Sequence, residues 1–145
     1  MSRLIGLDHG SRRIGVAVGE TETGMAFARA AIPRRNLAAD LAAVEALVLV
    51  EGADLVVIGL PLNMDGTEGP QAASARDFGE RLIALGMRVA HEDERLSSWE
   101  AGELLREAGR RPARASGELD STAARLILQQ YLDARRSAGA PEETV

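Results

Sequence analysis

The sequence predicts an α/β fold in which a mixed five-stranded sheet is flanked by α-helices. Three short apolar runs come first, at residues 3–8, 13–18 and 27–32, and brief turns separate them, which is typical of antiparallel strands. From residue 37 onward, helical and strand-like segments alternate along the chain. Strands that are separated by helices pair in parallel through right-handed crossovers, so the sheet should combine both kinds of pairing.

The first helix follows the third strand. Pro33 stops that strand, and Asn36 can cap a helix over residues 37–50. This segment is the most hydrophobic of the chain, and we expect a buried helix. It carries Asp40 and Glu45 and is shorter than the roughly 18 to 20 apolar residues that a membrane-spanning helix needs.

The central part of the chain predicts a strand, a loop, a helix and a further strand. Residues 55–58 are continuously apolar, as in a strand that is buried on both faces. Residues 59–69 have the composition of a loop, and helical spacing returns over 70–85 until Gly86 ends it. The fifth strand is expected at residues 87–91.

The C-terminal part predicts two helices around a basic loop. The first runs from about residue 97 to Gly109, and residues 110–117 form the loop. The last helix spans 119–136, with the apolar side Leu119, Ala123, Leu126, Ile127, Gln130 and Tyr131. No second domain or internal repeat is visible, so we expect one domain over 1–137 and a disordered tail over 138–145.

Composition places the protein in a reducing compartment. The chain has no cysteine, which excludes disulfides and a thiolate zinc site. The apolar stretch before Asp8 is too short for the hydrophobic part of a signal peptide. We therefore expect a cytoplasmic protein with no membrane partner.

The overall charge is acidic, but the basic residues are grouped. The formal net charge is -5 and the pI about 5.1, whereas duplex binding usually depends on a basic surface. Every one of the 17 basic residues is arginine, whose planar side chain suits bidentate phosphate contacts. Several arginines are adjacent, at 12–13, 34–35, 110–111 and 135–136. Grouped arginines could offset the net negative charge locally.

Three acidic positions are candidates for a metal site. Asp8 closes the first strand, Asp93 and Glu94 follow the fifth, and Asp120 stands near the start of the last helix. Ligands gather at the carboxyl ends of parallel strands, where clustered carboxylates repel unless a hard cation such as Mg²⁺ or Mn²⁺ lies between them. Singly, each acid could instead be a solvated strand end or a helix cap. Alternation turns His9 away from Asp8, so His9 is not an expected ligand.

Four segments resemble, in order, the signature blocks of the YqgF family, also called RuvX. They are residues 8–17 (DHGSRRIGVA), 59–66 (GLPLNMDG), 93–98 (DERLSS) and 120–124 (DSTAA). The resemblance implies a ribonuclease-H-like fold related to Holliday junction resolvases. It also implies the activity of a pre-16S rRNA nuclease, which acts in maturation of the ribosomal RNA 5′ end.

The resemblance also assigns roles to individual residues. It places Asp8, Glu94 and Asp120 at a catalytic metal site that holds two Mg²⁺ or Mn²⁺ ions, with Asp93 as the alternative to Glu94. It implies phosphate contacts by Arg13 and Arg95. It also implies that the loops 59–69 and 110–117 hold the substrate strand, and the second of these loops carries Arg110, Arg111 and Arg114. Serines 97 and 98 replace the threonines that are more usual in the family, and the hydroxyls are kept.

Several functions remain open on the sequence alone. RNA is the favoured substrate, but a Holliday junction resolvase acting on branched DNA would use the same chemistry and would need a symmetric dimer. The oligomeric state, monomer or homodimer, is not determined. An actin-like ATPase would need two copies of the fold. A non-catalytic RNA-binding or transcription-associated module would have no use for three clustered acids.

Overall fold

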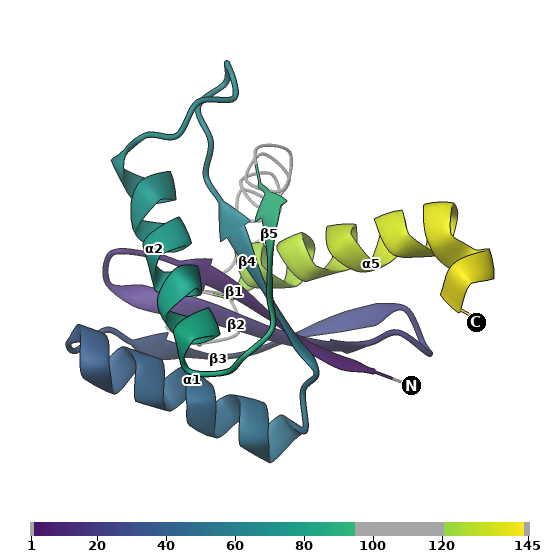
Figure 1. Ribbon diagram of the computed structural model, residues 1–145, viewed down its shortest axis with the longest axis horizontal. Helices are drawn as coiled ribbons and strands as arrows, with labels where there is room; N and C mark the ends of the chain where they lie inside the picture. The colour runs from purple at the N-terminus through teal and green to yellow at the C-terminus, as the bar shows by residue number, and fades with distance from the viewer. Residues whose placement is uncertain (1, 95–120, 144–145) are drawn as a thin grey trace, which may run out of the picture.

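The computed structural model describes the backbone of residues 2–94 and 121–143, and side chains as far as Arg135. The described part holds a five-stranded sheet with the order β3-β2-β1-β4-β5 (Figure 1). Its strands are β1 (Arg3–His9), β2 (Arg13–Glu20), β3 (Met25–Pro33), β4 (Leu55–Leu60) and β5 (Val89–Asp93). The helices described are α1 (Leu37–Glu51), α2 (Pro70–Ala84) and α5 (Thr122–Glu143).

The strand pairing confirms the predicted mixed sheet. β1, β2 and β3 pair antiparallel, whereas β4 pairs in parallel with β1 on one side and with β5 on the other. The short connections between the first three strands permit antiparallel hairpins, while α1 and α2 supply the crossovers that parallel pairing requires. The carboxyl ends of β1, β4 and β5 therefore lie at one edge of the sheet.

Two hydrophobic layers cover the two faces of the sheet. Figure 1 shows α1 and α2 on one side and α5 on the other. Alternation along β1 sends Ile5 and Leu7 into the cluster on the α1 and α2 side and Leu4 into the cluster under α5. Gly6 shares the α5 face, where an added Cβ would lie 2.8 Å from Leu128 Cβ. The missing side chain thus lets α5 lie close against the sheet.

The helix α1 is not the buried helix that its composition predicts. Asn36 does cap it, because its Oδ1 accepts the Ala39 N–H at 2.8 Å. Only Asp40 and Val44 are buried, however, whereas Leu49 and Val50 are 77% and 80% exposed. A helix on the outside of a sheet can bury one stripe only, so hydrophobic residues around its whole circumference must leave some in water.

The fifth strand lies two residues later than predicted. The residues before the strand form the turn that ends α2. In this turn Gly86 has a left-handed φ of 99°, and the Met87 N–H donates to the Leu82 carbonyl. Such a helix-ending turn satisfies carbonyls that the last helical turn leaves free. The shift extends the strand to Asp93 and puts Glu94 immediately beyond its end.

The last helix differs from its prediction at its end and on its buried face. It continues to Glu143, so residues 138–143 are helical where we expected a disordered tail, because extending an existing helix costs far less than starting one. Its buried residues are Ala124, Ile127, Leu128 and Leu132, of which only Ile127 was predicted. The expected start of this helix, the preceding helix and the basic loop lie outside the described residues. Within the described ranges, no helix is both long and apolar enough to cross a membrane.

Candidate active site

Asp8 lies near the carboxyl end of β1, on the face that α5 covers. Leu7 of β1 pairs with Ile58 of β4, so the next positions, Asp8 and Gly59, are neighbours across the two strands. Alternation places Asp8 on the same face as Gly6, which contacts α5. Burial raises the pKa of the Asp8 carboxyl above its usual value. A buried carboxylate of this kind gains from a nearby cation.

Glu94 reaches the same place from β5. Its backbone N–H donates to the Leu60 carbonyl at 3.1 Å, and the residue is only 4% exposed. An added Cβ at Gly59 would lie 3.1 Å from Glu94 Oε2 and 2.5 Å from Ile127 Cδ1 of α5. The Glu94 carboxylate therefore lies over Gly59, on the α5 side of the sheet, beside the strand position of Asp8.

Asp93 faces the other way. The preceding residue, Glu92, accepts a hydrogen bond from Gln130 Nε2 of α5 at 2.6 Å, which places Glu92 on the α5 face. Asp93 pairs with Leu60, whose side chain belongs to the cluster on the α1 and α2 side. Of the two adjacent acids that the sequence leaves open, Glu94 is the one that shares a face with Asp8.

Ser121 fixes the start of α5 at this site. It is fully buried, and its Oγ accepts the Val16 N–H at 2.9 Å. Val16 pairs with Leu7 of β1 and lies where the pairing of β2 with β3 shifts register, so its N–H uses a side chain from another element. Asp120 directly precedes Ser121 in the sequence but lies outside the described residues. Sequence reasoning missed this anchor, although the DSTAA block contains it.

Two of the three predicted metal ligands, Asp8 and Glu94, lie among the described residues. These residues contain no group of three or more acids or histidines that could hold an ion, and the third predicted acid, Asp120, is outside them. The pair that is described fits a hard cation, since both members are carboxylates and both are largely removed from water. Two buried like charges on one face are costly to ionise together unless a positive charge accompanies them.

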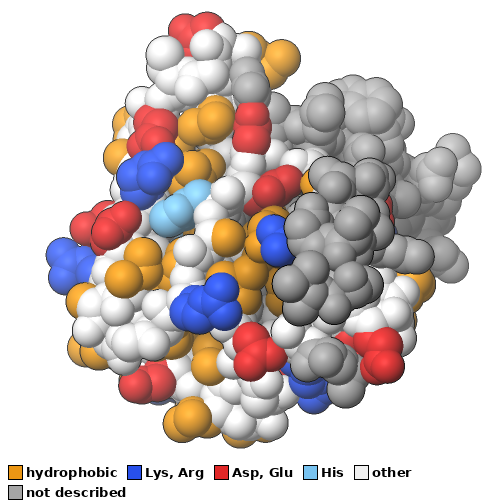
Figure 2. Space-filling model, turned by 45° about the vertical axis from the view of Figure 1, so that its right-hand side comes forward, with side chains coloured by type: hydrophobic (Ala, Val, Ile, Leu, Met, Phe, Trp, Pro, Cys, Tyr) orange, Lys and Arg blue, Asp and Glu red, His pale blue; other side chains and the backbone are white. Residues whose placement is uncertain are grey.

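Two of the adjacent arginine pairs, 12–13 and 34–35, have neighbouring backbones near this edge. Arg13 begins β2, and the Arg34 N–H donates to the Arg12 carbonyl at 2.9 Å, which joins the two N-terminal arginine pairs. Over the described part of the face in Figure 2, acidic, basic and hydrophobic side chains are interspersed. The described part of this face is thus not a broad basic surface. Predicted phosphate contacts at Arg95, Arg110, Arg111 and Arg114 lie outside the described residues.

His9 points away from the acids, as alternation predicts. Its ring packs against Phe78 of α2, with the ring centroids 4.7 Å apart. Burial lowers the pKa of His9, and the Arg34 charge lowers it further. The imidazole is therefore neutral near pH 7, on the opposite side of the sheet from Asp8.

This sheet order, with helices on both faces and carboxylates at the ends of parallel strands, defines a ribonuclease-H-like fold. The structure of Thermus thermophilus RuvC in complex with a Holliday junction substrate matches with a TM-score of 0.58 at 14% identity, covering 94% of this chain and 96% of that one. The large terminase nuclease of the thermophilic phage G20c matches with a TM-score of 0.54 at 16% identity, covering 90% and 81%.

The sequence comparisons identify the family. The family model RuvX, described as Holliday junction resolvase, matches residues 2–134. Relatives named "Putative pre-16S rRNA nuclease" include one from Synechococcus sp., 45% identical over 91% of this chain and 89% of its own length. Another, from Anaeromyxobacter dehalogenans, is 46% identical over 92% and 98%. The chain belongs to the RuvX family of nucleases, and is thus a hydrolase acting on ester bonds.

Proposed function

We propose that this protein is a metal-dependent nuclease that hydrolyses phosphodiester bonds of RNA in the cytoplasm, at the 5′ end of precursor 16S rRNA. The observation that carries the proposal is the convergence of the Asp8 and Glu94 positions on the α5 side of Gly59. The names of the relatives support the substrate, and the fold shared with nucleases supports the chemistry.

The chain's own residues would hold and orient the reacting groups. Asp8, Glu94 and Asp120 would bind two Mg²⁺ or Mn²⁺ ions, which when bound activate water and neutralise charge on the leaving oxygen. The Ser121 to Val16 hydrogen bond would keep the start of α5 beside β1. Arg13, with Arg95, would contact substrate phosphates as bidentate donors. Arg110, Arg111 and Arg114 would bind the strand further from the reaction.

Cleavage of branched DNA is the second candidate function. It is favoured by the description of the family model and by the match to a RuvC bound to a Holliday junction. Paired cuts across a junction require two active sites related by twofold symmetry, and hence a homodimer. A non-catalytic RNA-binding module is the least favoured, because clustered carboxylates repel phosphate.

A cleavage panel with a matched pair of variants tests the proposal. The substrates are single-stranded RNA, a precursor rRNA 5′ end and a four-way DNA junction, each with Mg²⁺ or Mn²⁺. Glu94→Gln removes a charge on the α5 face, and Asp93→Asn removes one from the adjacent residue on the other face. We expect Glu94→Gln to abolish cleavage and Asp93→Asn to retain it.

The outcomes separate the candidates. Cleavage of RNA alone supports rRNA maturation, whereas cleavage of the junction by a dimeric protein supports the resolvase. If Asp93→Asn abolishes activity and Glu94→Gln does not, the assignment of the acids is wrong. If the unaltered protein binds RNA but cleaves no substrate with either ion, the nuclease proposal fails.

A further inference from the structure

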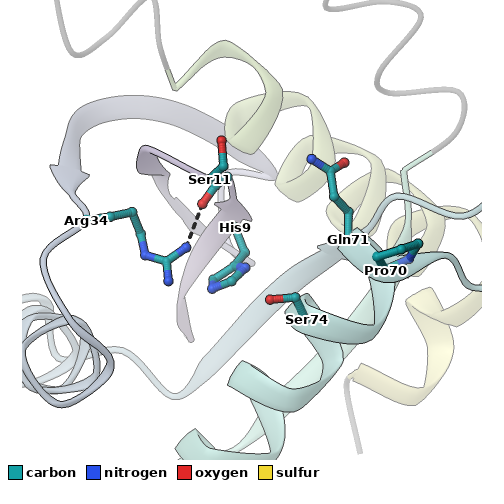
Figure 3. A pocket seen from close by; sticks show the side chains of 7 residues that line it. His9, Ser11, Arg34, Pro70, Gln71 and Ser74 are labelled. Atoms are coloured by element: carbon teal, nitrogen blue, oxygen red, sulfur yellow. Dashed lines mark hydrogen bonds between the residues drawn. The ribbon is translucent and has the colours of Figure 1, made fainter.

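A small pocket opens on the side of the sheet opposite the acids, at the same edge. Its volume is about 160 Å³, and it lies between the end of β1, the residues after β3 and the start of α2. Its lining residues are His9, Gly10, Ser11, Arg34, Pro70, Gln71 and Ser74. In Figure 3 the side chains of His9, Arg34 and Ser74 point toward one another. This volume holds several waters but is below the roughly 300–1,000 Å³ of pockets that enclose drug-sized ligands.

The polar side chains of this pocket include several that can donate hydrogen bonds. The guanidinium of Arg34, the hydroxyls of Ser11 and Ser74 and the amide of Gln71 can all donate. None of the seven lining residues carries a carboxylate, although acids outnumber bases in the chain by 22 to 17. The chemistry of the lining therefore suits an oxyanion.

Arg34 is held in a fixed orientation. Its Nε donates to Asp40 Oδ2 at 2.7 Å. Its Nη1 donates to the Gly10 carbonyl at 2.7 Å, the hydrogen bond drawn as a dashed line in Figure 3. Asp40 is only 1% exposed and also accepts the Arg35 N–H at 3.0 Å. These contacts leave Nη2 of Arg34 with no partner among the described residues. A guanidinium positioned in this way loses little further side-chain entropy when it binds an anion.

The first turn of α2 faces the same pocket. Gly69, at the N-cap, has no side chain to accept from the first N–H groups, and Pro70 and Gln71 line the pocket. Free N–H groups and the positive end of the helix dipole favour an anion at such a position. The terminus of α2 and its Ser74 hydroxyl thus face the Arg34 guanidinium and the Ser11 hydroxyl, which come from other segments.

We propose that this pocket binds a phosphate group of the nucleic-acid substrate, away from the bond that is cleaved. This inference rests on the proposed nuclease function for the identity of the ligand. Asp8 and His9 are consecutive and project to opposite faces of one sheet edge, so a strand that crosses the edge can reach both sides.

Binding of inorganic phosphate tests the pocket without any cleavage assay. The chain has two histidines, of which His9 lines the pocket and His91 packs against Gly79 of α2. Ring resonances followed by NMR at constant pH and ionic strength should shift with phosphate for His9 and stay fixed for His91. Equal shifts of both rings, or no shift of either, would show that the pocket does not select phosphate.

A matched pair of charge substitutions tests its role in substrate binding. Ser74→Glu puts a carboxylate into the pocket, and Ala73→Glu puts the same charge on an exposed neighbour on the same helix. Both variants are compared in the Asp8→Asn background, so that the oligonucleotide stays intact. We expect Ser74→Glu to weaken binding of single-stranded RNA at least about tenfold, and Ala73→Glu to change it less than about twofold.

The form of the RNA distinguishes the two sources of phosphate. RNA with a 5′-phosphate, a 3′-phosphate or only hydroxyl ends is compared in the same binding assay. A Ser74→Glu effect that appears only with a phosphorylated end identifies a terminal phosphate, and an effect on all three identifies an internal one. If Ser74→Glu and Ala73→Glu weaken binding equally, the pocket has no role in substrate binding. Specific phosphate binding by a protein that cleaves nothing would leave the pocket standing and refute the nuclease proposal instead.

Discussion

Replacement of Gly59 by alanine should affect stability and activity through two different contacts. Gly59 lies on β4 with the Glu94 carboxylate and Ile127 of α5 above it. The new Cβ would meet Ile127 Cδ1 at 2.5 Å, Glu94 Oε2 at 3.1 Å and Glu94 Cδ at 3.2 Å. Ile127 must therefore move, and the carboxylate must shift by a few tenths of an ångström.

The cost can be worked from these contacts. Extra atoms in a packed core cost typically about 1–3 kcal/mol, and replacing glycine regains about 0.4–1 kcal/mol by restricting the unfolded chain. The atom that must move is the end of a side chain, so we expect a net loss of about 1 kcal/mol, which lowers Tm by about 3 °C in a chain of this length. A small shift of Glu94 should lower kcat about tenfold, since displacements of about 1 Å cost about a hundredfold.

A double-mutant cycle with Ile127→Val separates the two effects. Ile127→Val removes Cδ1 and alone should cost about 0.5–1.5 kcal/mol. In the Gly59→Ala background it also removes the closest clash, so the two changes together should cost less than their sum by about 0.5 kcal/mol or more. The Glu94 contact remains in the double variant, and kcat should stay low. Urea unfolding and the RNA cleavage assay measure the two quantities.

Two results would refute this reasoning. Additive losses of stability would show that the new Cβ and Ile127 do not compete for space. Full recovery of both kcat and stability in the double variant would show that the new Cβ does not displace Glu94. The loss of activity in Gly59→Ala would then be due to the altered packing of α5.

Four further predictions concern Asp8, the metal ion, His91 and the basic loop. Asp8→Asn should abolish cleavage while leaving the free energy of unfolding without metal unchanged or higher, because burial already disfavours the charged carboxylate; a clear loss of stability in urea would contradict this. A chelator should stop cleavage, and Mg²⁺ or Mn²⁺ but not Ca²⁺ should restore it; activity that survives chelation would indicate a metal-free mechanism. Burial lowers the pKa of His91, whose Nε2 lacks a partner among the described residues, below the ordinary histidine value of about 6.5. The unfolded chain therefore takes up the proton first, and stability should fall from about pH 6.5 downward, with a shallower fall in His91→Gln. Replacing Arg110, Arg111 and Arg114 together by alanine should weaken RNA binding and flatten its salt dependence with little change in kcat; identical salt slopes would exclude the loop from binding.

Local patterns in the sequence determined most of the fold. The apolar runs predicted the strands, and the lengths of their connections predicted which pairs are antiparallel. A short turn can join only antiparallel neighbours, because parallel neighbours need a long crossover connection. Asn36 marked the start of α1 for an equally local reason, since its side chain bonds to a backbone N–H three residues on. Alternation along β1 also placed Asp8 and His9 on opposite faces.

Contacts between distant segments determined which faces of the helices α1 and α5 are buried. Hydrophobicity could not show that α1 exposes Leu49 and Val50, since only the width of its contact with the sheet determines how much is buried. The buried stripe of α5 was likewise selected by glycines on distant strands, of which Gly6 admits Leu128.

The site itself depends on the same long-range packing. Glu94 rather than Asp93 shares a face with Asp8 because the register of β5 against β4 pairs Glu92 with Gly59 and Asp93 with Leu60, which fixes the alternation at the end of β5. The hydrogen bond from Val16 to Ser121 joins positions 105 residues apart, and the phosphate pocket is formed by three segments far apart in the sequence. Local preferences act over a few residues, so only the packed sheet determines which distant side chains meet.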